Sequence, residues 1–386
     1  MNTYDTAILG LGTMGSATAL ELRRRGASVI GFDPFAPPHG NGSHSGDTRI
    51  FRLAHYDALN YVPLAKRAGE LWDKLSCEFG VPLLHRIGLL KMGPQDDALL
   101  AGIAKAASTH DIPVERLSAT EIRYRYPAFE IPEEFIGYFE TTAGWIDVDA
   151  SIRGMQKKAR DLGAELCLDE GVQSWHSGRD GVIVRTARRE ICANRLIIVA
   201  GAWAVQILHE LGLPIQLIRK TFFWFDPVKP QNFTDAALPV FGFPANIFYA
   251  FPNSRGAGVK VAEHKGGDEI DRPDAPLEPA DPRSVLQTVS RFMPGLAGPP
   301  PGDARRIRKT SPCLYSMADD EHFIIDVHPE LKNVVFAAGF SGHGFKFTPL
   351  IGEIMADLAL QGDTEIPIDF LRYRGPRQSF PRVERG

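Results

Sequence analysis

A glycine-rich turn near the start of the chain has the spacing that binds a dinucleotide. After a short apolar run, residues 10–15 read GLGTMG, in which Gly10, Gly12 and Gly15 form a GxGxxG motif, and a helical pattern follows. A second apolar run then ends in Asp33. Glycines let the backbone approach a pyrophosphate, the helix N-terminus attracts its charge, and the acid accepts hydrogen bonds from ribose hydroxyls. This order predicts a dinucleotide site in a βαβ unit.

Two other segments are rich in groups that bind anions. Residues 41–52 read NGSHSGDTRIFR, a polar loop directly after the nucleotide unit. Residues 341–347 read SGHGFKF and precede a helical pattern, so this glycine-rich loop would lead into a second helix N-terminus. Two such sites fit a flavin better than a nicotinamide, because a helix N-terminus stabilises negative charge on a reduced flavin ring.

The composition excludes several other classes of function. The 386 residues carry a net charge of -4, so the chain lacks the excess of positive charge that is typical of proteins that bind nucleic acid. Four cysteines without CxxC spacing argue against a zinc site or a disulfide framework, so no metal is expected. The longest apolar run, residues 196–208, is too short to span a membrane, and the nucleotide motif leaves no place for an export signal. We therefore expect a cytoplasmic protein that binds neither nucleic acid nor membrane.

The patterns along the chain predict an α/β fold with two domains. A Rossmann-like FAD-binding domain would be discontinuous, and a second α+β domain, built on a mainly antiparallel sheet, would bind the substrate. The first domain is expected at residues 1–80, 150–215 and 306–386, and the second at residues 81–149 and 216–305.

Helix ends are marked by particular residues. Ser118 and Glu121 predict a capping box, and helical patterns cover residues 97–108 and 151–162. After an apolar strand at residues 334–338, Thr348 is expected to cap a helix that has Pro349 in its first turn. Gly362 lies past the end of that pattern.

These motifs together resemble the monomeric sarcosine oxidase and N-methyltryptophan oxidase family. The resemblance rests on the N-terminal GxGxxG, on NGSHSGDTRIFR, and on four later motifs, namely GAW at 201–203, CLY at 313–315, DEHFIID at 320–326 and AAGFSGHGFKF at 337–347. It implies covalently held FAD and oxidation of a secondary amino acid by oxygen, which gives the demethylated amino acid, formaldehyde and hydrogen peroxide. HKGG at 264–267 and RIGL at 86–89 look slightly closer to the N-methyltryptophan branch. The resemblance also implies a monomer whose partners are an amino acid and oxygen.

The resemblance assigns cofactor contacts residue by residue. Cys313 matches the cysteine joined to the flavin 8α-methyl group, and Lys260 matches the lysine that activates oxygen over the flavin ring. A fixed cation there would stabilise superoxide as its charge develops. The other cofactor-binding residues so implied are Gly10, Gly12, Gly15, Asp33, Ser43, His44, Thr48, Arg49, Gly342, Gly344 and Lys346.

The resemblance also assigns the substrate side of the site. Arg52 and Lys346 match the pair that binds the substrate carboxylate, which suits a guanidinium fork and an ammonium. Tyr249, His264 and Tyr315 match groups that line this side, and they join Lys260 and Arg49 as candidate catalytic residues. From the residues alone, plain alternatives stay open: solvated arginines and lysines, a structural histidine, and a cysteine that acts as a small buried hydrophobe.

One position departs from the family pattern, and the substrate stays open. Ser45 stands where the family usually has a second histidine near the flavin ring, while His44 keeps the first position. The substrate could instead be sarcosine, a cyclic imino acid, a glycated amino acid or glycine, and a dehydrogenase with another electron acceptor or a flavin sensor are further alternatives. Four aromatic residues could line a roomy substrate pocket or belong to the core: Phe222, Phe223, Trp224 and Phe241.

Overall fold

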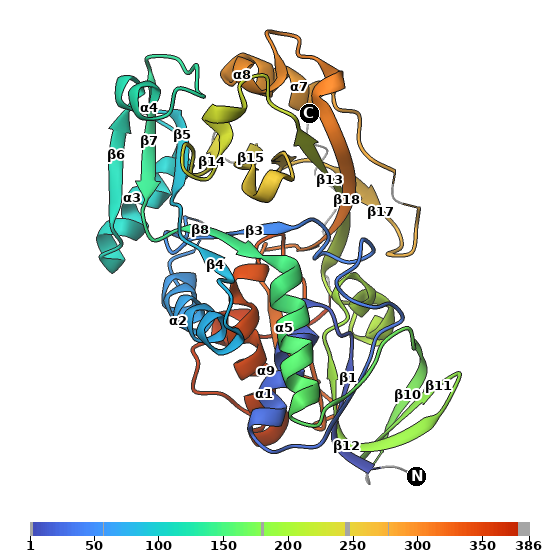
Figure 1. The fold of residues 1–386 in the computed structure, drawn as a ribbon. Helices are drawn as coiled ribbons and strands as arrows, with labels where there is room; N and C mark the ends of the chain where they lie inside the picture. Colours follow the sequence, from blue (N-terminus) through green and yellow to red (C-terminus); the bar gives the residue numbers. More distant parts are fainter. Residues whose placement is uncertain (1–2, 57, 179–180, 244–247, 277, 377–386) are drawn as a thin grey trace.

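The computed structural model of the chain describes residues 3–56, 58–178, 181–243, 248–276 and 278–376. It has two lobes, each built on a large sheet, and a small third sheet lies between them (Figure 1). The predicted fold class is confirmed, because one large sheet is mainly parallel at its centre and the other is mainly antiparallel.

The first lobe contains an eight-stranded sheet. Its central strands run in the order β12, β1, β2 and β9 and are parallel, and β20 is parallel to β12. Their apolar side chains are buried on both faces, as a parallel sheet covered by helices requires. The strands are β1 (Thr3–Leu9), β2 (Val29–Phe32), β9 (Glu165–Cys167), β10 (Val172–Gly178), β11 (Gly181–Thr186), β12 (Glu190–Ile198), β19 (Ile324–Val327) and β20 (Val334–Ala338).

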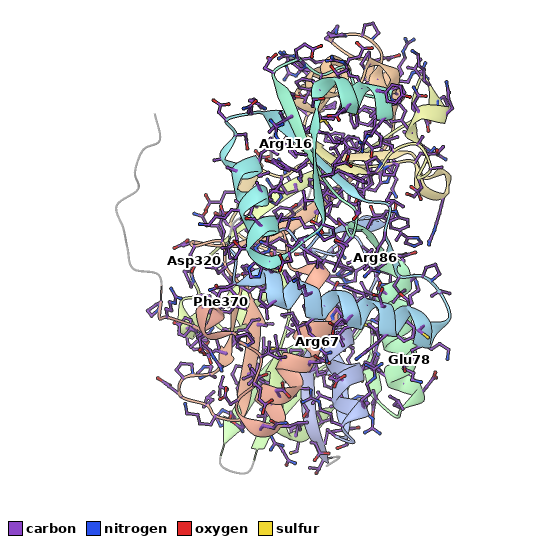
Figure 2. The ribbon with its side chains drawn as sticks, turned by 90° about the vertical axis from the view of Figure 1, so that its left-hand side faces the viewer. Arg67, Glu78, Arg86, Arg116, Asp320 and Phe370 are labelled. Atoms are coloured by element: carbon purple, nitrogen blue, oxygen red, sulfur yellow. The ribbon has the colours of Figure 1, made fainter. Side chains whose placement is uncertain are left out.

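Helices pack closely against this sheet. α1 (Thr13–Arg24) contacts α5 (Val148–Asp161) and α9 (Thr348–Gln361). At Gly352 of α9, an added Cβ would lie 2.9 Å from the backbone of Ala17, so glycine allows the close approach of α1 and α9. α2 (Tyr61–Phe79) covers α9, and Arg67, on the face seen in Figure 2, lies 2.9 Å from Glu353.

The second lobe contains a nine-stranded sheet, of whose described pairings only that of β14 with β5 is parallel. Helices α3 (Ala98–His110), α4 (Ala119–Arg125), α7 (Arg283–Phe292) and α8 (Pro294–Ala297) lie beside it (Figure 1). The strands are β5 (Leu89–Pro94), β6 (Val114–Ser118), β7 (Phe135–Glu140), β13 (Ile215–Phe225), β14 (Val240–Phe243), β15 (Phe248–Phe251), β16 (Val259–Glu263), β17 (Asp268–Ile270) and β18 (Ile307–Ala318).

Short elements complete the fold. The third sheet consists of β3 (Thr48–Phe51), β4 (Leu84–His85) and β8 (Gly144–Asp147). Within the described residues, no helix is both long enough and apolar enough to cross a bilayer. The remaining helices are α6 (Ala204–Ile207) and the 3₁₀ turns η1 (Gly201–Trp203), η2 (His209–Leu211), η3 (Pro230–Phe233), η4 (Ser254–Gly256), η5 (Ala304–Arg306), η6 (Phe345–Phe347) and η7 (Asp369–Leu371).

Most local predictions are confirmed, and two helix starts are corrected. Ser118 and Glu121 form the predicted capping box. Thr348 does not cap α9, because its hydroxyl donates to the carbonyl of Phe345 while η6 leads directly into the helix. α5 begins three residues earlier than predicted, since the Asp147 side chain accepts a hydrogen bond from the Ala150 N–H.

The predicted domain limits stay a prediction. The strand pairings show that β18, which follows residue 306, pairs along its length with β13 of the second sheet. This strand carries Cys313 and Tyr315 and belongs to the same sheet as β15, which carries Tyr249.

Candidate active site

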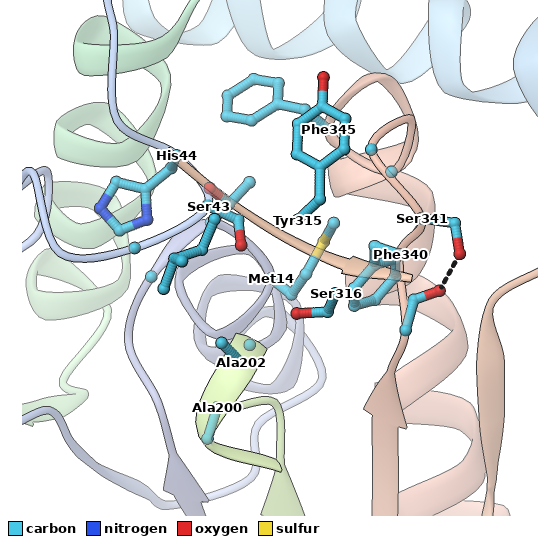
Figure 3. Close-up of a pocket in the computed structure, with 18 of the residues that line it drawn as sticks. Met14, Ser43, His44, Ala200, Ala202, Tyr315, Ser316, Phe340, Ser341 and Phe345 are labelled. Atoms are coloured by element: carbon cyan, nitrogen blue, oxygen red, sulfur yellow. Dashed lines mark hydrogen bonds between the residues drawn. The ribbon is translucent and has the colours of Figure 1, made fainter. Parts of the chain in front are cut away.

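A cavity of about 1280 Å³ lies where the carboxyl ends of the parallel strands face the second sheet. Residues that follow β1, β2 and β20 line it, and so do Lys220 of β13 and Tyr249 of β15. Figure 3 shows part of this lining, with Met14 of α1, His44 and Tyr315 around the same space. Pockets for one small ligand commonly measure about 300–1,000 Å³. This cavity therefore has room for a dinucleotide and a small second molecule.

The glycine turn forms a cradle in which a side chain at Gly10 or Gly15 would collide with the backbone. Gly10 has φ +95°, and a Cβ there would lie 2.7 Å from the carbonyl oxygen of Val199. A Cβ at Gly15 would lie 1.8 Å from the Gly10 oxygen. The Asp33 carboxylate is buried and accepts a 2.8 Å hydrogen bond from the Leu11 N–H, which fixes the acid beside the turn. The cradle at the N-terminus of α1 fits a pyrophosphate.

His44 lies against this cradle as a neutral imidazole. A Cβ at Gly12 would lie 3.3 Å from its Nδ1, and its Nε2 accepts a 3.1 Å hydrogen bond from the His39 N–H. The pKa of His44 is lowered to about 3, mainly by burial and also by the charges of His39 and Arg49. Protonation would also remove the acceptor at Nε2.

Arg49 holds the loop before β3 against the strand that carries Cys313. Its guanidinium donates to four backbone carbonyls, those of Ser43, Ser45, Gly46 and Thr48, at 2.6–3.0 Å. It also lies 4.0 Å from the sulfur of Cys313, and that thiol lies 3.7 Å from the Ser43 oxygen. Arg49 thus connects this loop with the position of Cys313 on β18.

Ser45, the position that departs from the family pattern, joins the same two segments. Its hydroxyl donates a 2.9 Å hydrogen bond to the carbonyl of Pro312, the residue before Cys313, and the side chain is buried. The serine therefore contributes a structural contact between the polar loop and β18.

Lys260 of β16 is buried behind this loop. Its ammonium donates a 2.7 Å hydrogen bond to the Thr48 carbonyl and lies 4.2 Å from the ring centre of Phe251. Burial lowers the pKa of Lys260 well below its usual value, and nearby Arg49 lowers it further. Faces of Phe222 and Trp224, whose centres lie 5.0 and 5.9 Å from the ammonium, favour the charged form.

Arg52 and Lys346 lie at the other end of the cavity. Both line it, and both are buried, with exposed fractions of 7% and 4%. Arg52 donates a 2.6 Å hydrogen bond to the Ala54 carbonyl, and its guanidinium lies 4.1 Å from the ring centre of Tyr56. Lys346 donates a 2.7 Å bond to the His343 carbonyl. Two buried cationic side chains therefore line the same end of the cavity.

A buried carboxylate positions the segment that carries Arg52. Glu140 of β7 accepts hydrogen bonds from the backbone N–H groups of Leu53 and Ala54 at 2.7 and 3.0 Å. Burial raises the pKa of Glu140, and these two hydrogen bonds, together with nearby Arg52, act in the opposite direction. β7 thus ties the second sheet to the substrate end of the cavity.

Neutral polar groups lie between these cations. The hydroxyls of Tyr249 and Tyr315 are 3.3 Å apart, and the ring of His264 lies about 6 Å from both rings, at 6.2 and 6.0 Å. Burial raises the pKa of Tyr249 to about 12 and that of Tyr315 well above its usual value. Burial also lowers the pKa of His264 to about 3. All three groups are therefore uncharged at neutral pH.

The second glycine-rich loop is shaped by close contacts. A Cβ at Gly342, which has φ +73°, would lie 2.4 Å from the Tyr315 ring, and one at Gly344 would lie 2.6 Å from the Cβ of Phe340. The Ser341 hydroxyl donates to the Gly339 carbonyl at 3.0 Å (Figure 3). The loop lines the cavity and brings Lys346 into it.

Most of the predicted site residues line this one cavity. The described lining includes Gly10, Gly12, Asp33, Ser43, His44, Arg49, Arg52, Tyr249, His264, Tyr315, Gly342, Gly344 and Lys346. Four predicted residues lie behind the lining, in the parts described: Gly15, Thr48, Lys260 and Cys313. Their roles stay predictions.

Of the two roles left open for the four aromatic residues, the structure supports the core. Phe222, Phe223, Trp224 and Phe241 are buried in the core and are not among the described residues that line the cavity.

Within the described ranges, no three His, Cys, Asp or Glu side chains gather as a metal ion would require.

Sequence reasoning missed two lysines of the cavity. Lys91 and Lys220 line it and are both 5% exposed. The sequence did carry a signal for each, because both lie within strongly apolar strands, LLKMGP and IQLIRKTFFWF. A lysine in an apolar strand is rarely buried without a function or an ionic partner.

Comparisons with known proteins agree with this geometry. The family model described as "FAD dependent oxidoreductase" matches residues 5–358. Monomeric sarcosine oxidase of Bacillus sp. (strain B-0618) is 36% identical over 383 residues, which cover 97% of this chain and 96% of the relative. N-methyl-L-tryptophan oxidase of Salmonella enteritidis PT4 is 35% identical over 364 residues, covering 92% and 95%. These identities do not separate the two branches.

The fold is also similar to solved structures. The open form of NikD, described as an unusual amino acid oxidase essential for nikkomycin biosynthesis, superposes with a TM-score of 0.85 at 25% identity. The similarity covers 98% of this chain and 100% of NikD.

We predict that His44 destabilises the fold as the pH falls. Its pKa is about 3 when folded and about 6.5 when unfolded, so the unfolded chain binds one more proton between these values. Stability then falls by about 1.4 kcal/mol per pH unit from pH 6.5 toward 3. His44→Gln should flatten the fall in urea midpoint between pH 7.5 and 5, whereas His176→Gln, at an exposed position of β10, should not. Equal slopes in all three proteins would contradict the prediction.

Proposed function

The chain belongs to the family of FAD-dependent oxidoreductases, and on that premise we propose that it oxidises an N-methyl amino acid with oxygen. The products would be the demethylated amino acid, formaldehyde and hydrogen peroxide. One observation carries this proposal: the buried pair Arg52 and Lys346 lines the same cavity as the dinucleotide cradle. An amino acid whose carboxylate binds this pair would extend its amine toward the uncharged groups at the cavity centre.

The cavity residues fit the cofactor at both ends. The turn at Gly10 to Gly15 would hold the pyrophosphate, and Asp33 would accept hydrogen bonds from ribose hydroxyls. The loop at Gly342 and Gly344 would lie near the ring. When bound, FAD supplies the acceptor for a hydride equivalent from the carbon next to the substrate nitrogen and then delivers the electrons to oxygen.

The residues of the chain would orient the amine and favour its neutral form. Tyr249 and Tyr315 keep their protons, because burial raises their pKa values, and so can donate hydrogen bonds to substrate. His264 stays an uncharged imidazole. A hydride leaves most readily from a carbon next to a neutral amine. The cations that lower the pKa of His264 would also lower that of an amine bound beside it.

We also propose a monomer in the cytoplasm. The names of the sarcosine oxidase relatives, which describe them as monomeric, support the first part. The location rests on the sequence alone.

We expect N-methyl amino acids to bleach the protein-bound flavin without oxygen. The test is a panel of sarcosine, N-methyltryptophan, N-methylglutamate and the cyclic imino acid pipecolate, followed by absorbance under anaerobic conditions. Admission of air should then restore the colour and yield one peroxide per turnover. Bleaching by pipecolate alone would show that the substrate is a cyclic imino acid and not an N-methyl amino acid. Bleaching without peroxide would indicate a dehydrogenase. If no compound of the panel bleaches the flavin, the proposal is wrong.

We predict that Cys313 carries the flavin as a thioether. Its position supports this, because the Cys313 sulfur lies 4.0 Å from the guanidinium of Arg49, which lines the cavity. Acid-precipitated native protein should stay yellow, and Cys313→Ala should release the colour into the supernatant. Cys167→Ala, which changes another buried cysteine, should keep a yellow pellet. A colourless native pellet would refute covalent attachment.

We predict that Lys260 serves the reaction with oxygen. Its place beside the Thr48 carbonyl and close to Arg49 supports this, because a fixed cation stabilises negative charge on oxygen as it develops. Lys260→Met should slow aerobic reoxidation by about 10²–10³-fold, the cost of losing one such group. Anaerobic reduction by substrate should change much less. Equal losses in both half-reactions, measured by stopped flow, would show that the role is misassigned.

A further inference from the structure

The loop of residues 263–267 connects β16 with β17 and forms one wall of the cavity. Both strands pair with β13, and the positions at which their pairings end are separated there by only Lys220 and Thr221. The connecting segment is longer than this gap, so it must leave the sheet, as extra residues in a bulge do. Residues 264–266 accordingly line the cavity.

Lys220 lies beside this loop and binds it. The side chain is buried, lines the cavity, and donates a hydrogen bond from its ammonium to the Gly266 carbonyl. Strand alternation places Lys220 on the same face of β13 as Phe222, which belongs to one apolar cluster with Tyr249 and Tyr315. A hydrogen bond from an ammonium is roughly twice as strong as one between neutral groups. Lys220 therefore fastens the loop to β13.

Close packing at Gly267 holds the loop at the same place. Gly267 has φ +96°, and a Cβ there would lie 2.5 Å from the carbonyl oxygen of Arg219 and 3.1 Å from the Cδ of Lys220. Glycine thus lets the backbone of the loop lie directly on β13. One residue further, the side chains of Asp268 and Arg219 form an ion pair. The second half of the loop is held by its backbone and by the Lys220 ammonium together.

The same ammonium lies beside the groups at the cavity centre. Its Nζ is 5.3 Å from the ring centre of Tyr315, and the ring of His264, which the loop carries, is 6.0 Å from that of Tyr315. Burial lowers the pKa of Lys220 to about 8, and the charge of Glu263 acts in the opposite direction. Lys220 is therefore mostly protonated at neutral pH and can donate to Gly266 as a cation.

We infer that Lys220 is a positioning residue, which holds His264 at the amine of the substrate by binding the carbonyl of Gly266. The inference rests on the proposed function and adds a residue to its site. Lys220 acts through the loop. Without its hydrogen bond, residues 263–267 would move away from β13, and the imidazole would lose its place beside Tyr249 and Tyr315.

The first test is cleavage of the holoenzyme by trypsin after Lys265, the exposed lysine of the loop. A protease cuts a loop when the loop opens locally. Lys220→Met removes the donor and should speed this cleavage about 10–100-fold, the range for losing a hydrogen bond of a charged group. Cleavage after Arg305, an exposed residue of η5, should keep its rate. No acceleration at Lys265, or equal acceleration at both sites, would overturn the inference.

Two further variants separate the loop contact from other effects. Gly267→Ala displaces the loop by its collision with Arg219 and leaves the lysine in the chain, so it should also speed cleavage at Lys265. Lys229→Met changes an exposed lysine just after β13 that is not among the described residues lining the cavity, and it should leave the rate unchanged. Acceleration by Lys229→Met as large as that by Lys220→Met would contradict a specific contact.

The second test separates binding from chemistry. Stopped flow measures anaerobic reduction of the flavin by the N-methyl amino acid that bleaches it fastest, and a titration measures binding of methoxyacetate, in which oxygen replaces the nitrogen of sarcosine. Lys220→Met should slow reduction at saturating substrate about 10–100-fold, as expected when a reacting group is displaced by about 1 Å. The Kd of methoxyacetate should change less than threefold. A loss confined to binding would overturn the inference.

A double variant shows whether Lys220 acts through His264. His264→Gln should itself slow reduction, and adding Lys220→Met should slow it less than threefold more, because two residues that act as one unit are not additive. Losses that multiply, or an unchanged rate in His264→Gln, would show that Lys220 does not act through the imidazole and would overturn the inference.

The two proposals fail in different ways. If the wild-type protein and Lys220→Met are reduced at the same rate, the inference is wrong and the proposed oxidase function stands. If no N-methyl amino acid reduces the flavin, the proposed function falls, whereas the trypsin test still decides whether Lys220 holds the loop.

Discussion

The structure depends on keeping several positive charges away from water around one cavity. The fold meets this constraint with backbone carbonyls: Arg52 donates to Ala54, Lys346 to His343, Lys260 to Thr48, and Lys220 to Gly266. A carbonyl satisfies a donor without cancelling its charge, whereas a carboxylate would do both. The loops that offer these carbonyls must therefore be held firmly in place.

That requirement explains why the loops around the cavity are tied to distant elements. Glu140 fixes the backbone at residues 53 and 54 from the second sheet, and the Trp72 indole of α2 donates to the Lys346 carbonyl at 2.8 Å. Arg49 donates hydrogen bonds to four carbonyls of the loop before β3, and the Ser45 hydroxyl connects that loop to β18. The ties made by Glu140, Trp72 and Ser45 join residues far apart in the sequence, so the site depends on contacts between distant segments of the chain.

The sequence predicts what local chemistry decides and misses what long-range pairing decides. The glycine cradle, the capping box of α4 and the strand at 334–338 follow from short patterns, because neighbouring residues determine them. Burial of Lys91 depends instead on a glycine about 150 positions further along the chain, on a strand that pairs with β5. The aromatic run of β13 left a pocket and the core as alternatives, since alternation does not reveal which partner covers each face, and the structure places it in the core.

The distribution of charge also connects binding with chemistry. The groups at the centre, His264, Tyr249 and Tyr315, are held neutral by burial, while the cations stand around them. Under the proposed function, a substrate would bring its carboxylate to this rim and its amine to the centre, where the positive field opposes a proton on nitrogen. Recognition of the acid group and deprotonation of the amine would then be two consequences of one electrostatic arrangement.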